Sequence, residues 1–126
     1  MKTYKLPIVI VLQITEEDIE DIVDTAFDSG IFYWCARAKY TGDPCGDTDG
    51  KHLINGGSII LYDNEDGSES ELTLDKLLDG IDKWVAKGYD RYHAVQSDGT
   101  LDTCEIDAEM ADIIIQFALF GDIIYG

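Results

Sequence analysis

Three stretches of this chain place apolar residues at the i, i+3, i+4 and i+7 positions of a helix, and these stretches constrain the fold most. The first begins at Thr15 and ends at Gly30, the second runs from Leu74 to Gly88, and the third lies between Asp107 and Gly121. Thr and Asp are preferred at helix starts, and Gly is common just after helix ends. The pattern therefore predicts three amphipathic helices with their own start and stop signals.

Other segments have patterns typical of strands. The run 4–14 is rich in β-branched residues and predicts a buried strand, with Pro7 near its start. The run 31–40 alternates along its length and predicts a strand whose core face is aromatic. Segments 58–62 and 69–73 flank an acidic turn and predict a hairpin, and 123–125 predicts a short closing strand.

The remaining segments, 41–57 and 89–105, lack periodicity. The first is crowded with Gly, Asp, Asn and Pro and predicts a long loop. The resulting order is β-α-β-β-β-α-α-β, which lacks the regular alternation of a doubly wound parallel sheet. We therefore expect one α+β domain over residues 1–126, with a mostly antiparallel sheet and about three helices packed on it.

The charge balance restricts the partners of this chain. It has 26 Asp and Glu against 9 Lys and Arg, which gives a formal net charge of −17 and an isoelectric point near 4.1. Such a surface repels DNA, RNA and anionic lipid at long range. We therefore expect no direct nucleic-acid ligand and no membrane, and a basic protein as the partner.

Cysteine usage and hydropathy predict the compartment. Three cysteines without framework spacing are expected to be reduced thiols. No apolar run approaches the ~20 residues of a membrane helix, and no signal-peptide cleavage pattern follows the basic N-terminal residues. We therefore expect a cytoplasmic protein.

The acids gather on predicted helices and on the predicted hairpin, so folded elements would hold them at fixed spacing, as a nucleic acid holds its phosphates. Solubility alone is the competing explanation for so much charge. The candidate partner-binding surface consists of Glu16, Glu17, Glu20, Asp21, Asp24, Asp28, Asp63, Glu65, Asp66 and Glu69.

A second candidate site would use aromatic and cationic side chains to stack on and pair with a nucleotide. Its members are Tyr33, Arg37, Tyr89, Arg91 and Tyr92. Such a pocket would lie between protomers, so a homodimer is part of this alternative.

Motifs for catalysis, metals and cofactors are not recognised. The segment from Cys45 to Gly56 lacks the acids that an EF-hand needs at both ends. The spacing of His52, His93 and the cysteines matches no zinc site. We therefore predict no catalytic residue, no metal and no cofactor, and keep a small metal-dependent enzyme as the third hypothesis.

Five segments are distinctive as a set: GIFYW at 30–34, DGT at 98–100, EIDAE at 105–109, ALFG at 118–121 and the acidic run ITEEDIEDI at 14–22. Together they resemble a family of small acidic proteins encoded by phages, prophages and plasmids. The resemblance implies a mobile-element setting and no catalytic residues. Small acidic proteins of such elements commonly inhibit host defence, which is an argument by association.

The leading hypothesis is therefore a non-enzymatic inhibitor of a host defence protein, such as a CRISPR effector or a restriction nuclease, that acts through a nucleic-acid-mimicking acidic surface. A sponge for a small nucleotide immune signal is the alternative.

Overall fold

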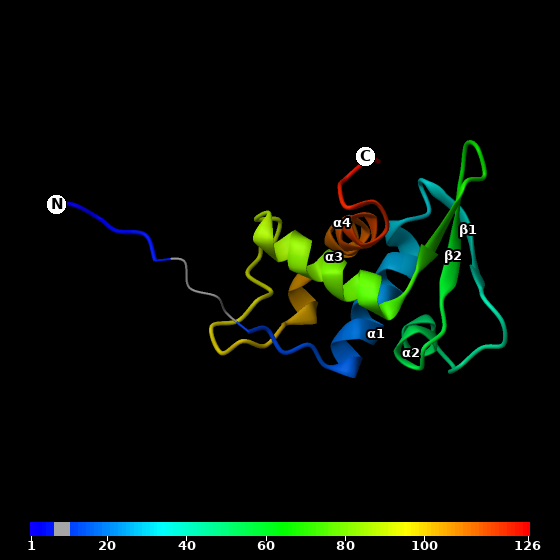
Figure 1. Ribbon diagram of the computed structural model, residues 1–126, viewed down its shortest axis with the longest axis horizontal. Coiled ribbons are helices and arrows are strands. Elements are labelled where there is room, and N and C mark those ends of the chain that lie inside the picture. The colour runs from blue at the N-terminus through cyan, green and yellow to red at the C-terminus, as the bar shows by residue number, and fades with distance from the viewer. Residues whose placement is uncertain (7–10) are drawn as a thin grey trace.

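The computed structural model describes residues 1–6 and 11–126 (Figure 1). Its elements follow in the order α1 (Glu16–Thr25), a π-helical turn η1 (Ala26–Gly30), β1 (Cys35–Tyr40), α2 (Asp49–Ile54), β2 (Ile59–Asp63), β3 (Glu69–Leu72), α3 (Leu74–Ala86), a 3-10 turn η2 (Thr103–Glu105) and α4 (Ala108–Phe120). The α+β class and the antiparallel sheet that the sequence predicts are confirmed.

The sheet has the order β1-β2-β3, and both pairings are antiparallel. Its inner face buries Ile59, Leu61 and Leu72 against the helices, which lie to one side of the strands in Figure 1. The register between β1 and β2 shifts between Cys35 and Arg37. This β-bulge allows Cys35 to be buried while Arg37, two positions later, lies on the outer face.

The pair α3 and α4 forms the centre of the core. Trp84 and Phe117 are almost fully buried there. The two helices approach closely at Gly80, where an added Cβ would lie 2.6 Å from the carbonyl oxygen of Ile114. Within residues 1–6 and 11–126, no helix combines the length and apolar character needed to cross a bilayer.

The predicted helix starts are confirmed. The Thr15 hydroxyl accepts the backbone N–H of Asp18, whose carboxylate accepts the Thr15 N–H, both at 3.0 Å, so the expected capping box is complete. Thr73 caps α3 and Asp107 caps α4 in the same way, through accepted backbone N–H groups. These contacts satisfy donors that a helix leaves unpaired in its first turn.

The predicted loop 41–57 contains a helix, so that part of the prediction is wrong. Thr48 accepts the N–H of Lys51 at 3.1 Å and starts α2, which then lies against α1. A six-residue helix is too short to show a clear apolar period, and the Gly and Asp residues around it are typical of turns. Packing against α1 therefore decides its structure.

The terminal strands also differ from the prediction. Residues 4–6 and 11–14 form no strand, and residues 7–10 of that run lie outside the described residues. In place of a strand ladder, Gln13 donates its N–H to the carbonyl of Gly99 at 2.8 Å. Residues 123–125 are likewise irregular, because their backbone N–H groups bind the side chains of Asp122 and of Gln116 in α4 and not a neighbouring strand.

The predicted strand 31–40 begins only at Cys35. Trp34 is buried as expected, whereas Phe32 is 45% exposed, so the aromatic core face is shorter than the alternation predicts. A tight turn occupies 32–34, since the N–H groups of Trp34 and Cys35 both bind the carbonyl of Ile31.

Candidate acidic interaction face

The outer side of α1 and η1 carries six acids, which we name the α1 acidic face. The helix packs its apolar stripe of Ile19, Ile22 and Val23 into the core, so the intervening acids point outward. All are exposed except Glu20, which is half-buried. The members of the face are Glu16, Glu17, Glu20, Asp21, Asp24 and Asp28.

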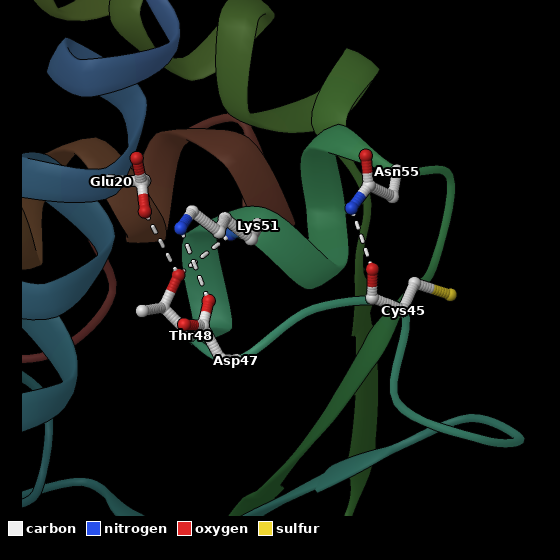
Figure 2. Close-up of polar contacts among 6 residues, drawn as sticks. All are labelled: Glu20, Cys45, Asp47, Thr48, Lys51 and Asn55. Atoms are coloured by element: carbon white, nitrogen blue, oxygen red, sulfur yellow. Dashed lines mark hydrogen bonds and ion pairs between the residues drawn. The ribbon is translucent and has the colours of Figure 1, made fainter.

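Glu20 is half-buried because α2 crosses α1 at this point, as Figure 2 shows. The Thr48 hydroxyl donates to Glu20 at 3.1 Å while it also caps α2. Gly50 permits the crossing, since a Cβ added there would lie 2.7 Å from the Cα of Glu20. The position of Glu20 is therefore fixed by the contact between two helices.

The same crossing brings Lys51 and Asp49 to the face. Lys51 forms an ion pair with Asp47 at 3.2 Å, drawn in Figure 2, one turn before it in the sequence. Asp49 accepts a hydrogen bond from the Tyr40 hydroxyl. Sequence reasoning did not include Asp49 in the face, because its segment was expected to be a loop.

Asp24 is surrounded by other carboxylates. Partial burial raises the pKa of its carboxyl above the ordinary value of 3.8, and the charges of Asp49, Glu20, Asp28 and Asp21 raise it further. Like charges disfavour the ionised form of one another. The fold therefore holds these carboxylates close enough to interact unfavourably, which a cationic partner would relieve.

A shallow hollow of about 320 Å³ lies beside this cluster. Asp21, Asp24 and Asp28 line one side, and Thr103 and Cys104 of η2 line the other. The Thr103 hydroxyl donates to Asp21 at 2.7 Å. The face is therefore not flat, and the hollow places three carboxylates from successive helical turns around one space.

Ion pairs within the described chain do not neutralise the face. The described residues form three ion pairs: Lys51 with Asp47, Lys83 with Asp79, and Arg91 with Glu109. None of them includes a member of the α1 acidic face. Its charges are thus available to an external cation.

The four hairpin acids of the candidate surface lie elsewhere. In Figure 1, α1 begins at the lower edge of the molecule, and the turn between β2 and β3 lies at its upper right edge. Glu65, Asp66 and Glu69 are exposed, whereas Asp63 is half-buried. The ten candidate acids therefore form two separate groups.

Asp63 organises the hairpin turn. Its carboxylate accepts hydrogen bonds from the Tyr125 hydroxyl and from the backbone N–H groups of Glu65 and Asp66. These bonds, led by the one from Tyr125, lower the pKa of Asp63 below 3.8. Because its oxygens already accept these bonds, the main role of Asp63 is to stabilise the turn and not to bind a partner.

Tyr33, a member of the alternative ligand site, is 53% exposed, and its hydroxyl joins a polar network around a buried acid. Asp112 of α4 is 5% exposed and accepts hydrogen bonds from the Tyr33 hydroxyl at 2.6 Å and the Trp34 indole N–H at 2.8 Å. The Gln116 amide adds a third at 3.1 Å. Burial, followed by the bond to Asp112, raises the pKa of Tyr33 to about 12. No sequence signal identified Asp112 as a buried residue. It lies beside the apolar stripe of the predicted third helix, where an acid is normally exposed to solvent.

The other four members of the alternative site have different neighbours. Arg37 lies over the ring of Tyr62 at 4.3 Å on the outer face of the sheet. Tyr89 is half-buried against Phe117, and Arg91 forms an ion pair with Glu109. Tyr92 is exposed. Within the described chain, no hydrogen bond or ion pair joins Tyr33 or Arg37 to the 89–92 segment.

His52 is a packing residue of α2 and is fully buried. Its Nδ1 accepts the N–H of Cys45 at 3.1 Å, so Nε2 carries the proton and donates to the carbonyl of Ser58 at 2.9 Å. Its ring stacks on Tyr40. Neither nitrogen is left for a metal or a substrate in this arrangement. In the part of the chain that the structure describes, no three His, Cys, Asp or Glu side chains gather in a group that could hold a metal ion.

Comparisons with protein-family models, curated proteins and solved structures gave no match to this chain.

Proposed function

We propose that this protein is a non-enzymatic binding protein of a mobile element that inhibits a basic, nucleic-acid-binding host defence protein through its α1 acidic face. The observation that carries the proposal is that six carboxylates on one surface form no ion pair with a described residue. Partial burial raises the pKa of Asp24, and repulsion from Asp49, Glu20, Asp28 and Asp21 raises it further. A groove lined with Lys and Arg would remove that repulsion.

The spacing of the charges supports a nucleic-acid-like role. From Glu16 to Asp28 the chain takes twelve steps of about 1.5 Å, so six acids span roughly 18 Å and their five intervals average about 3.6 Å. One strand of DNA carries a charge about every 3.4 Å along the helix axis. A groove built for a phosphate strand would therefore meet a similar linear charge density on α1.

Association is expected to be fast and sensitive to salt. Opposite charges steer the encounter, and at 0.15 M ionic strength the screening length is about 8 Å. Displacement of counterions from the acidic face adds a favourable entropy at low salt, as it does for DNA. These properties distinguish charge recognition from binding through an apolar pocket.

The test is affinity capture from a bacterial host lysate with washes at low and then high salt, followed by identification of the eluted proteins. The test variant replaces Glu16, Glu17, Glu20, Asp21 and Asp24 with Gln or Asn, which keeps the hydrogen-bond acceptors. The control variant makes five such replacements at Asp43, Asp75, Asp82, Glu105 and Asp122, outside the face, and so removes the same charge.

We expect the native chain and the control variant to capture a nuclease or effector that elutes with salt and whose DNA binding is blocked. The test variant should lose this capture. Equal capture by both variants would refute the role of the α1 acidic face. Capture of no protein by the native chain would refute the proposal and favour the nucleotide sponge, to be examined by extracting nucleotides from the purified protein.

A further inference from the structure

The outer face of the sheet is open and carries an ordered charge pattern. Cross-strand partners lie on the same face of a sheet, so the register defines rows that run across the three strands. Arg37 of β1 pairs with Tyr62 of β2, which pairs with Glu69 of β3. The next row repeats the order with Lys39, Ile60 and Glu71. Each row is thus a cation, an apolar residue and a carboxylate.

The exposure of these six residues agrees with an uncovered face. The four charged residues are exposed, and Tyr62 and Ile60 of the central strand are half-buried. Arg37 leans over the ring of Tyr62. On the opposite face, Ile59 and Leu61 are buried in the core. The helices therefore cover one face of the sheet and leave the other to solvent or to a partner.

The charges of a row do not neutralise each other within one molecule. Neighbouring strands lie about 4.8 Å apart, so β1 and β3 are separated by roughly 10 Å, which is too far for an ion pair. Neither Arg37 nor Lys39 forms an ion pair with any described residue. These are two of only nine Lys and Arg in the chain. Two cations are thus held on a single face with no acid in contact.

We propose that this face is a self-complementary interface for a second copy of the chain. A rotation of 180° about an axis parallel to the strands places β1 of one copy over β3 of the other. Arg37 of each copy then faces Glu69 of the other, and Lys39 faces Glu71. The central residues Tyr62 and Ile60 meet their own counterparts across the axis, as an isologous interface requires. Sheets pack face to face in this aligned manner at about 10 Å.

The other two-fold arrangement of two stacked sheets is disfavoured. A two-fold axis across the strands would place β1 over β1 and β3 over β3, which brings like charges together. The charge pattern therefore selects one of the two aligned arrangements.

Size and net charge set the strength of the dimer. Three short strands bury less than the ~1,200–2,000 Å² of typical stable interfaces. The net charge of −17 on each copy opposes association. The dimer is therefore weak, and the dimeric fraction rises with protein concentration.

The test is sedimentation velocity over a concentration series with the native chain and two charge-reversed variants. One variant is Arg37→Glu/Lys39→Glu, whose rows carry only acids. The other is Glu69→Lys/Glu71→Lys, whose rows carry only cations. We expect the native sedimentation coefficient to rise with concentration and each variant alone to remain monomeric. An equimolar mixture of the two variants should dimerise, because their faces are complementary.

Two control variants make the same change in net charge away from the face. Lys2→Glu/Lys5→Glu matches the first variant, and Asp82→Lys/Glu105→Lys matches the second; both should dimerise as the native chain does. Circular dichroism checks that every variant is folded. A native chain that stays monomeric near 1 mM, or variants that dimerise alone, would overturn the proposal. The reversed residues lie outside the α1 acidic face, so this result is independent of the capture experiment.

Discussion

Tyr125 stacks on Trp34, with ring centroids 4.8 Å apart and planes within 2° of parallel. Gln116 of α4 supports this contact by accepting the backbone N–H groups of Ile124 and Tyr125 at 2.9 Å. Residues 124 and 125 are therefore joined to α4 and to the turn before β1. Segments from distant parts of the sequence are held together by one stacked pair and one buried amide.

Substitution of Tyr125 should separate the stack from its hydrogen bond. Tyr125→Phe keeps the ring and loses the bond to Asp63, so it should lower the free energy of unfolding by about 1 kcal/mol. Tyr125→Ala removes both and should lower it by about 2 kcal/mol or more. Urea unfolding followed by fluorescence measures both values. Equal losses would show that the stack contributes nothing.

Asp112 should be among the residues most sensitive to substitution. Asp112→Ala leaves the Trp34 indole N–H and the Gln116 amide without their acceptor, which should cost about 3 kcal/mol. Tyr33→Phe removes one donor and leaves the others paired, so it should cost only about 1 kcal/mol. Thermal unfolding of both variants tests this order, and a reversed order would contradict the network.

Stability should fall at alkaline pH. The pKa values of Tyr33, Tyr40 and Tyr125 are each raised from 10.0 to about 12, the first two chiefly by burial and the third chiefly by its bond to Asp63. Folding thus favours the neutral phenols, which contribute stability in full below pH 10. This contribution is lost as the pH rises through about 12. Urea unfolding between about pH 9 and pH 12 should show the loss. The double variant Tyr33→Phe/Tyr125→Phe should show a smaller decrease of the unfolding free energy with pH.

Neutralising Asp24 should stabilise the fold at neutral pH. Its pKa is raised by burial and by four neighbouring carboxylates, so the fold favours the protonated form. The associated stability is present below the ordinary value of 3.8 and is lost as the pH rises through the higher folded value. Asp24→Asn should therefore raise the unfolding free energy by about 0.5 kcal/mol at pH 7.

The gain from Asp24→Asn should disappear in acid below about pH 3.8, where the native carboxyl is also neutral. Asp43→Asn in an exposed loop is the matched control and should change little at either pH. A gain that persists unchanged in acid would show that charge repulsion is not its cause.

Local signals explain which elements could be predicted. Thr15, Thr73 and Asp107 mark helix starts through bonds to residues three positions away, so a short window of sequence contains the information. The hairpin turn follows from Gly67, whose φ of 68° favours glycine. The helix α2 and the irregular terminal segments depend on contacts with distant residues, which no local pattern reveals.

The candidate site shows the same division. That the acids of α1 lie outside the core follows from the helical period, and the structure agrees. The approach of Asp49 to Asp24 depends on Gly50 packing against Glu20, a contact between residues thirty positions apart. The division of the ten acids into two groups also depends on the arrangement of elements in space. The outer sheet rows required the register, which alternation alone does not fix.

The bulge between Cys35 and Arg37 allows β1 to bury Cys35 in the core and to present Arg37 on the open face. In an uninterrupted strand, Cys35, Arg37 and Lys39 would all face the same way. The extra residue lets the segment before it satisfy the core and the segment after it present cations outward. Mutations at Arg37 and Lys39 can therefore change the partner preference of the open face while residues 31–35 keep their packing. Deletion of Ala36 would make Cys35 and Arg37 neighbours opposite Asp63 and Tyr62, so the strand would lose the bulge and its added twist while Cys35 stays inward and Arg37 outward.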